Sequence, residues 1–225
     1  MPEPPTIDEI IYTRRKTIAL VVQPSGRLVV RAPLRASQRE IRRLVEENAA
    51  WIKSKQEWAK TTYTPPVSRR FIAGEAFLFL GASYPLEIVH VNRPALKLDG
   101  KFYLAEAALP QAQAVFERWY RQQAQSILSE RVQHFASQNG FSYSKVKISS
   151  ARTRWGSCSA RGNLSFTWRL VMASLPVIDY VVVHELAHLK VRNHSRQFWD
   201  QVHQLMPDYK TRRAWLKEHG RTLIF

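Results

Sequence analysis

The alternation of apolar and polar residues in the first part of the chain predicts strands around a single helix. The runs TIALVVQ and RLVVR flank a Pro-Ser-Gly turn at 24–26, so a β-hairpin is expected over 17–32. Ser37 and Glu40 form a capping box, and apolar residues then recur at helical spacing as far as residue 58. Four further strands are expected at 75–80, 86–91, 95–98 and 101–104.

Longer helices dominate after Pro110. One apolar stripe runs to Asn139 and Gly140, a sequence that favours a helix C-terminus. The segment VIDYVVVHELAHL follows Pro176, which a first helical turn tolerates, and its apolar content predicts a largely buried helix. The other elements expected here are strands at 145–149 and 164–170 with an ordered loop at 154–159 between them, and amphipathic helices at 195–205 and 209–218.

The order of these elements predicts an α+β protein with two parts. Residues 1–105 form a β-rich N-terminal part with one helix, and residues 106–225 form a mainly helical part with its own strands. A chain of 225 residues buries roughly 70% of its unfolded surface, so folding requires neither a disulfide nor a metal. The single cysteine, Cys158, excludes an internal disulfide framework and a Cys-rich zinc finger.

Charge is the first unusual property of the chain. It has 34 Lys and Arg against 18 Asp and Glu, a net charge of +16, which suits nucleic acid or another polyanion as a partner. The basic residues occur in short clusters, which are also typical of an ordinary solvated surface. The N-terminus has no signal-peptide pattern and no run of about 18 apolar residues occurs. We therefore expect a cytoplasmic protein that does not associate with membranes. The sequence does not determine its oligomeric state.

The sequence HELAH at 184–188 carries the strongest chemical signal. On a helix, residues four apart lie about 40° apart around the axis and about 6 Å along it, so His184 and His188 can bind one ion from adjacent turns. Glu185 lies beside that face, where a carboxylate can act as a general base on water. A catalytic zinc site also needs a third protein ligand and an open position.

His194 is the leading candidate for the third ligand. In an unbroken helix it would point about 240° away from His188, so the chain must turn first, and residues 190–193 offer such a turn. His194 ranks above later carboxylates because imidazole suits zinc and its spacing needs only one turn. The competing carboxylates are Asp200, Asp208 and Glu218.

With this motif, the sequences RWGSCSARGNLSF, WRLVMA, NHSRQFW and MPDYK resemble the YgjP-like metallopeptidase family, bacterial zincins related more distantly to SprT-like and WLM proteases. The resemblance is continuous from about Arg154 to Lys210 and extends more loosely over about 17–219. It implies a zincin-like core, in which an active-site helix packs on a mixed sheet and binds one catalytic Zn²⁺. It implies that His184, His188 and His194 bind the zinc ion and that Glu185 is the catalytic base.

Three further features are candidates for the cleft. Tyr180 lies one turn before His184 and could donate a hydrogen bond to a developing oxyanion, or it is a core tyrosine. Cys158 could reach the metal in a resting state, or it is a small core residue. The strand expected to border the cleft and to pair with an extended substrate contains Asn163, Leu164, Ser165 and Phe166.

A zinc-dependent metallopeptidase that hydrolyses peptide bonds is the leading hypothesis for function. A metal-dependent nucleotide phosphohydrolase, such as a nucleoside triphosphate pyrophosphatase, would use the same site, but the chain has no GxxxxGK phosphate loop. A third possibility is a nucleic-acid-associated protein with a structural zinc. Such a zinc would need four protein ligands and no open position, whereas the sequence offers three good ligands.

Overall fold

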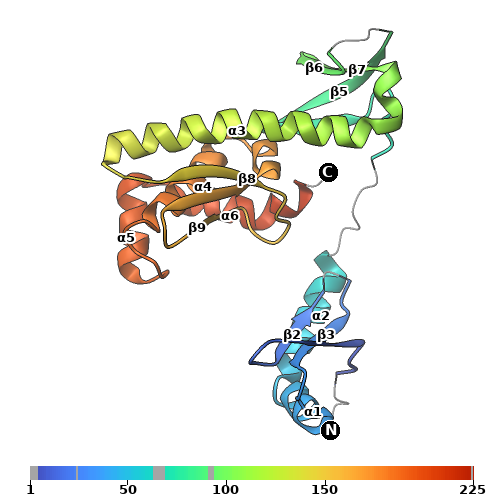
Figure 1. Cartoon of the computed structure of the whole chain (residues 1–225), viewed down its shortest axis with the longest axis vertical. Helices are drawn as coiled ribbons and strands as arrows, with labels where there is room; N and C mark the ends of the chain where they lie inside the picture. Colours follow the sequence, from blue (N-terminus) through green and yellow to red (C-terminus); the bar gives the residue numbers. More distant parts are fainter. Residues whose placement is uncertain (1–4, 24, 63–68, 91–93, 224) are drawn as a thin grey trace. The chain divides into compact units, whose positions relative to one another are not determined.

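The computed structural model describes residues 5–23, 25–62, 69–90, 94–223 and 225, which divide into two compact units (Figure 1). The units are Met1–Pro65 and Pro66–Phe225, and each has its own hydrophobic core. The division lies before the strands at 76–105, which share the core of the second unit, and not after residue 105 as the sequence pattern indicated.

The first unit contains a three-stranded sheet. Its strands, β1 (Glu9–Thr13), β2 (Ala19–Val22) and β3 (Leu28–Pro33), lie in the order β1-β3-β2. β2 and β3 form the expected antiparallel hairpin. The parallel pairing of β1 with β3 was not predicted, because the two strands are separated in sequence by β2 and carry no local signal for each other.

The helical pattern up to residue 58 forms two helices rather than one, α1 (Gln38–Glu47) and α2 (Ala49–Thr62). The Ser37 hydroxyl accepts a hydrogen bond from the Glu40 amide at 3.2 Å, as the capping box predicts. Asn48 separates the helices, and its side-chain amide donates to a carbonyl of the last turn of α1 at 2.8 Å. Such side-chain bonds compete with the helical backbone pattern and account for the break.

The second unit begins with a four-stranded sheet in the order β4-β5-β7-β6. Its strands are β4 (Ala76–Phe79), β5 (Ala82–Val89), β6 (Leu96–Asp99) and β7 (Lys101–Ala105). Aromatic packing joins this sheet to the long helix α3 (Ala112–Asn139), since the Phe116 ring centroid lies 4.3 Å from that of Phe77 and 5.2 Å from that of Phe102. α3 ends at Gly140, whose φ of +63° confirms the expected glycine stop.

A three-stranded mixed sheet follows α3. It consists of β8 (Lys145–Ser149), β9 (Gly156–Cys158) and β10 (Asn163–Thr167), in the order β8-β10-β9. The segment expected as an ordered loop at 154–159 thus contains a strand. β10 pairs antiparallel with β9 and parallel with β8.

The central position of β10 corrects the prediction for the substrate edge. The predicted edge residues were Asn163, Leu164, Ser165 and Phe166. They pair with β8 on one side and β9 on the other, so the backbone of β10 has no open edge for an extended substrate. Their alternation reflects burial of Leu164 and Phe166 in the core and not exposure at a cleft. β9 is the edge strand of this sheet on the side that contacts α4.

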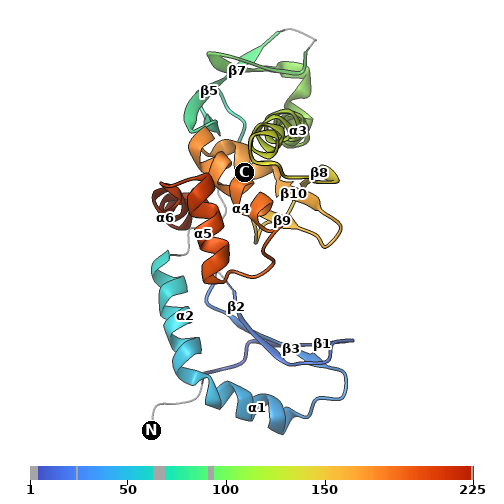
Figure 2. The same ribbon diagram turned by 90° about the vertical axis from the view of Figure 1, so that its left-hand side faces the viewer.

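The helix with the HELAH sequence, α4 (Leu175–Ala187), lies within the second unit. It contacts α3, β9, α5 (Arg196–Leu205) and α6 (Tyr209–His219) (Figure 2). These contacts explain why Val181, Val182 and Val183 are buried. The expected α+β class, with this helix packed on a mixed sheet, is confirmed. Within the described ranges, no helix is long and apolar enough to cross a membrane.

Candidate metal centre

His184 and His188 lie on one face of α4 at its C-terminal end. Ala187 is the last residue of the helix and His188 is its C-cap, and the two ring centroids are 4.9 Å apart. This placement follows from helix geometry, because residues four apart are neighbours on one face. Phe198 of α5 packs against both rings, with centroid distances of 4.9 Å to His184 and 4.4 Å to His188. The two imidazoles therefore rest on a buried aromatic side chain.

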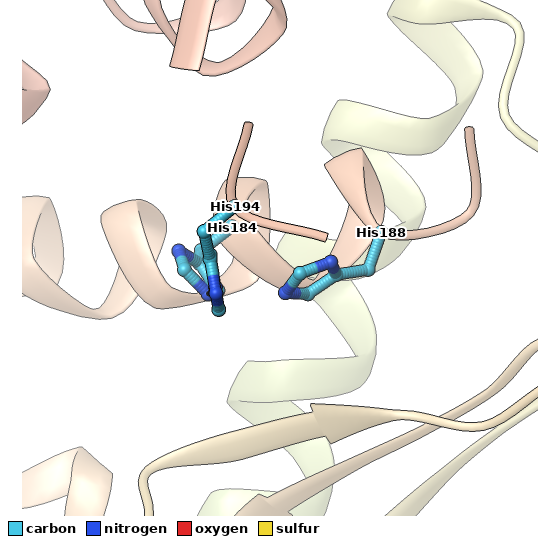
Figure 3. Close-up of side chains that lie close together, drawn as sticks. All are labelled: His184, His188 and His194. Carbon is cyan, nitrogen blue, oxygen red and sulfur yellow. Dashed lines mark hydrogen bonds between the residues drawn. The ribbon is translucent and has the colours of Figure 1, made fainter. Parts of the chain in front are cut away.

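The chain turns after α4 and brings His194 to the same place, as the spacing of the three histidines requires. The Val191 amide donates to the Ala187 carbonyl at 2.9 Å, which closes the turn. Nε2 of His194 then lies 3.1 Å from Nε2 of His184. One ring nitrogen from each of the three histidines lies within 4.8 Å of the others, and Figure 3 shows the three imidazoles converging.

The carboxylates considered as third ligands lie outside this cluster. In the part of the chain that the structure describes, the three histidines are the one group of His, Cys, Asp or Glu side chains placed to hold an ion. Asp208 is ion-paired with Arg212 at 2.8 Å, and Asp200 lies 3.9 Å from Arg196. Glu218 is likewise not part of the group.

Burial keeps the imidazoles of α4 uncharged. It lowers the pKa of His184 to about 3, with smaller contributions from the neighbouring histidines, and it also lowers the pKa of His188. Nδ1 of His188 lies 3.0 Å from the Val191 carbonyl, to which it donates in one neutral tautomer, leaving a lone pair on Nε2. Neutral imidazole is the form that binds a metal cation.

Glu185 directly follows His184 on α4, and its side chain lies inside the protein. The residue is 5% exposed, and its Oε2 atom has no hydrogen-bond partner among the described residues. Burial raises the pKa of this carboxyl to about 8, against a smaller opposite effect of the charge on Arg154. A carboxyl whose pKa is near neutrality is suited to accept a proton and to release it again.

Aromatic and basic residues of α4, α5 and α6 complete the surroundings. The Tyr180 ring centroid lies 6.0 Å from that of His184, and burial raises the pKa of the Tyr180 hydroxyl to about 12. Trp199 stacks on His194 at 5.8 Å, and the Arg213 guanidinium lies 4.3 Å from the Trp199 ring centroid. Sequence reasoning missed Trp199 and Arg213, because neither belongs to a ligand motif. A search for aromatic residues near the third histidine would have found Trp199.

Cys158 lies on β9 and is not part of the three-histidine group. Its thiol donates to the Ser159 carbonyl at 3.6 Å, and Sγ lies 3.9 Å from a guanidinium nitrogen of Arg192. Burial raises the pKa of the thiol, and the side chain packs at the margin of the main core. The structure thus places Cys158 among packing contacts on the edge strand.

Comparison with known families identifies the chain. Residues 16–219 match the YgjP-like metallopeptidase domain. The chain belongs to the YgjP-like metallopeptidase family. This match spans both structural units and includes the three histidines and Glu185, so the resemblance inferred from the sequence motifs is confirmed. No match was found among curated proteins.

Two solved structures are similar to part of the chain, and both are metallopeptidase zymogens. Abylysin of Pyrococcus abyssi is 23% identical, with a TM-score of 0.36, and the match covers 40% of this chain and 93% of that one. Jannalysin of Methanocaldococcus jannaschii is 16% identical, with a TM-score of 0.37, and the match covers 40% of this chain and 94% of that one.

Proposed function

We propose that this member of the YgjP-like family is a peptidase that depends on one catalytic zinc ion. The observation that carries the proposal is the convergence of three histidines, the first of which is followed in the sequence by a buried glutamate. One ring nitrogen of each histidine lies within 4.8 Å of the others, and Glu185 directly follows the first of them. Membership of a metallopeptidase family supports peptide bonds as the bonds that are hydrolysed.

The residues present fit a zinc ion. Nδ1 of His184 is buried without a hydrogen-bond partner among the described residues, and its Nε2 lies 3.1 Å from Nε2 of His194. Two neutral imidazole nitrogens at this distance repel each other through their lone pairs unless a proton or a cation lies between them. His184, His188 and His194 would hold Zn²⁺, and three ligands leave a fourth position open for water or substrate.

The residues around the ion have distinct roles in this proposal. Zn²⁺, when bound, supplies the Lewis acidity that polarises a carbonyl and lowers the pKa of water. Glu185, as the carboxylate, takes the proton of the attacking water and passes it to the leaving amine, a role that suits a carboxylate next to the first histidine in sequence. Tyr180, which is protonated at neutral pH, donates a hydrogen bond to the oxyanion that develops from the scissile carbonyl.

The edge strand β9 is the proposed site at which an extended substrate pairs. Gly156–Cys158 pair with β10 along one side only, and β9 contacts the helix that carries the histidines. A peptide that adds to this edge would have its backbone beside the metal centre, in a mode of recognition that recurs in peptide-binding proteins. β9 thereby takes the role that the sequence pattern suggested for residues 163–166.

A metal-dependent nucleotide phosphohydrolase is the second candidate, and positive charge beside the site favours it. The charge of Arg154 acts on Glu185, and that of Arg213 acts on His184 and Tyr180. Guanidinium groups bind phosphate well, so this charge is compatible with a polyphosphate substrate. A structural zinc in a nucleic-acid-associated protein finds less support, since it calls for a fourth ligand and the described residues supply three.

Glu185→Gln tests the proposal, because glutamine is nearly isosteric but cannot accept a proton at its amide. Zinc-loaded wild type and variant are assayed on casein and on nucleoside triphosphates, with zinc measured on the same samples. We expect casein cleavage to fall by at least about 10²-fold while zinc is retained. Nucleotide hydrolysis that is lost without any casein cleavage would support the phosphohydrolase instead. Full activity in the variant would refute Glu185 as the base.

A further inference from the structure

Gly156 of the edge strand β9 lies directly against the side chain of Glu185. A Cβ atom at position 156 would lie 2.5 Å from Oε1, 2.6 Å from Cγ and 2.8 Å from Cδ of Glu185. Non-bonded carbon atoms pack best at about 3.5 to 4.0 Å. A side chain at position 156 is therefore incompatible with the observed position of the Glu185 carboxyl.

Space, and not backbone conformation, is what the glycine supplies here. Gly156 is not among the residues with positive φ, whereas Gly26, Gly140 and several other glycines are. An alanine could therefore adopt the backbone of β9 without strain. The three atoms nearest to the added methyl all belong to the Glu185 side chain, so the closest steric conflict is with that side chain.

The strand is held in place on both sides of Gly156. Gly156 itself pairs with Phe166 of β10. Just before it, the Trp155 carbonyl accepts a hydrogen bond from the Thr167 amide at 2.9 Å. Just after β9, the Arg192 guanidinium donates to two backbone carbonyls at 2.8 Å and 3.2 Å. The backbone of β9 is thus restrained from moving away from α4.

The side chain of Glu185 is the part that can move. Its Oε2 atom has no hydrogen-bond partner among the described residues, so no bond holds that oxygen against rotation. We propose that Gly156 is a positioning residue: the space left by its missing side chain accommodates the Glu185 carboxyl in its observed position, one residue after the first of the three histidines. The inference rests on the proposed role of Glu185 as general base. A methyl group at 156 would displace the carboxyl and leave the metal ligands where they are.

Gly156→Ala tests this inference in the zinc-loaded protein. We expect kcat on casein or a derived peptide to fall by at least about 10²-fold, while KM stays within about threefold and zinc stays stoichiometric. Ser165→Thr is the control, since it adds one methyl to the neighbouring strand β10, whose backbone is paired on both sides, and it should keep kcat within about threefold. A Gly156→Ala enzyme that keeps its kcat within about threefold would overturn the proposal.

A thermal comparison tests the contact without any need for activity. Gly156→Ala should lower the melting temperature by roughly 2 to 8 °C when Glu185 is present, because overpacking is destabilising. In a Glu185→Ala background the same substitution should cost nothing, because the conflicting atoms are gone. An equal loss of melting temperature in both backgrounds would overturn the proposal. The comparison does not depend on the activity or the zinc content of Gly156→Ala. A failure of the proposed function would instead appear as full activity in Glu185→Gln.

Discussion

Nε2 of His194 lies 3.1 Å from Nε2 of His184, although His194 lies beyond the end of the helix that carries His184. The turn that joins them depends on Val191. Its amide donates to the Ala187 carbonyl at 2.9 Å, and its carbonyl lies 3.0 Å from Nδ1 of His188. The same residue thus closes the turn that brings His194 to the cluster and contacts His188, so the three histidines form one local unit.

His194→Ala should remove zinc from the protein. Loss of a direct ligand should lower zinc content at limiting metal by at least about tenfold, since disruption of outer-shell partners alone costs roughly 10- to 100-fold in affinity. Elemental analysis of purified samples measures this, with Asp208→Asn and Glu218→Gln as controls that keep their zinc. Zinc retained in His194→Ala and lost in either control would move the third ligand to a carboxylate.

Metal-free protein should lose stability as pH rises, because of Glu185. Burial raises the pKa of its carboxyl in the folded protein to about 8 from an ordinary value of 4.5. Folding therefore favours the protonated form, and stability is lost as pH rises from about 4.5 to about 8. Glu185→Gln carries no charge at any pH, so its stability advantage over wild type should grow across this window, on the order of 4 kcal/mol at about 1.4 kcal/mol for each pKa unit.

Urea denaturation of both metal-free proteins at about pH 5 and about pH 8.5 measures this difference. The buried histidines act in the opposite direction, because the lowered pKa of His184 costs stability as pH falls. They are present in both proteins, so their effect cancels in the comparison. A stability difference that is the same at both pH values would show that Glu185 is not desolvated in the folded state.

Tyr180→Phe should lower kcat without a comparable change in KM. If the hydroxyl donates only to the oxyanion, its loss should cost about 10²-fold in kcat, the size seen for single oxyanion donors. Tyr209→Phe is a suitable control, since Tyr209 is also buried and stacks on Trp199 at 5.5 Å. Steady-state kinetics on one peptide decides the matter. An unchanged kcat in Tyr180→Phe would make Tyr180 a core residue.

The basic surface should bind polyanions in a salt-dependent manner. On α1, Arg39, Arg42 and Arg43 are exposed, whereas Ile41 and Val45 of the same helix are buried. Replacing the three arginines with glutamine should weaken DNA binding. It should also make the slope of log binding constant against log salt concentration shallower, by about one for each phosphate that is no longer neutralised. Fluorescence anisotropy with labelled single- and double-stranded DNA at two salt concentrations measures both.

The control for this experiment is Lys97→Gln with Lys101→Gln, because these exposed lysines are already paired with Asp99 at 2.7 Å and Glu87 at 3.2 Å. It should bind DNA like the wild type. If neither wild type nor any variant binds at low salt, the charge of +16 serves solubility alone.

Local rules explain why part of the molecule could be predicted from the sequence. The Ser37 cap, the β2–β3 hairpin and the Gly140 stop each depend on residues within a few positions of one another. The same holds for the chemical candidates, since the four-residue spacing of His184 and His188 determines a shared helix face wherever the helix lies. The nearby His194 needed only a turn, which short sequence stretches can provide.

Interactions between distant segments explain the rest. β10 is central because β8 and the unpredicted β9 both pair with it, and no local pattern states how many neighbours a strand has. Trp199 reaches the histidines through the packing of α5 on α4. Burial raises the pKa of Glu185. The space beside its side chain is provided by Gly156, which is distant in sequence. Desolvation and close packing arise only when separate elements meet, so tertiary structure alone determined the surroundings in which these side chains would act.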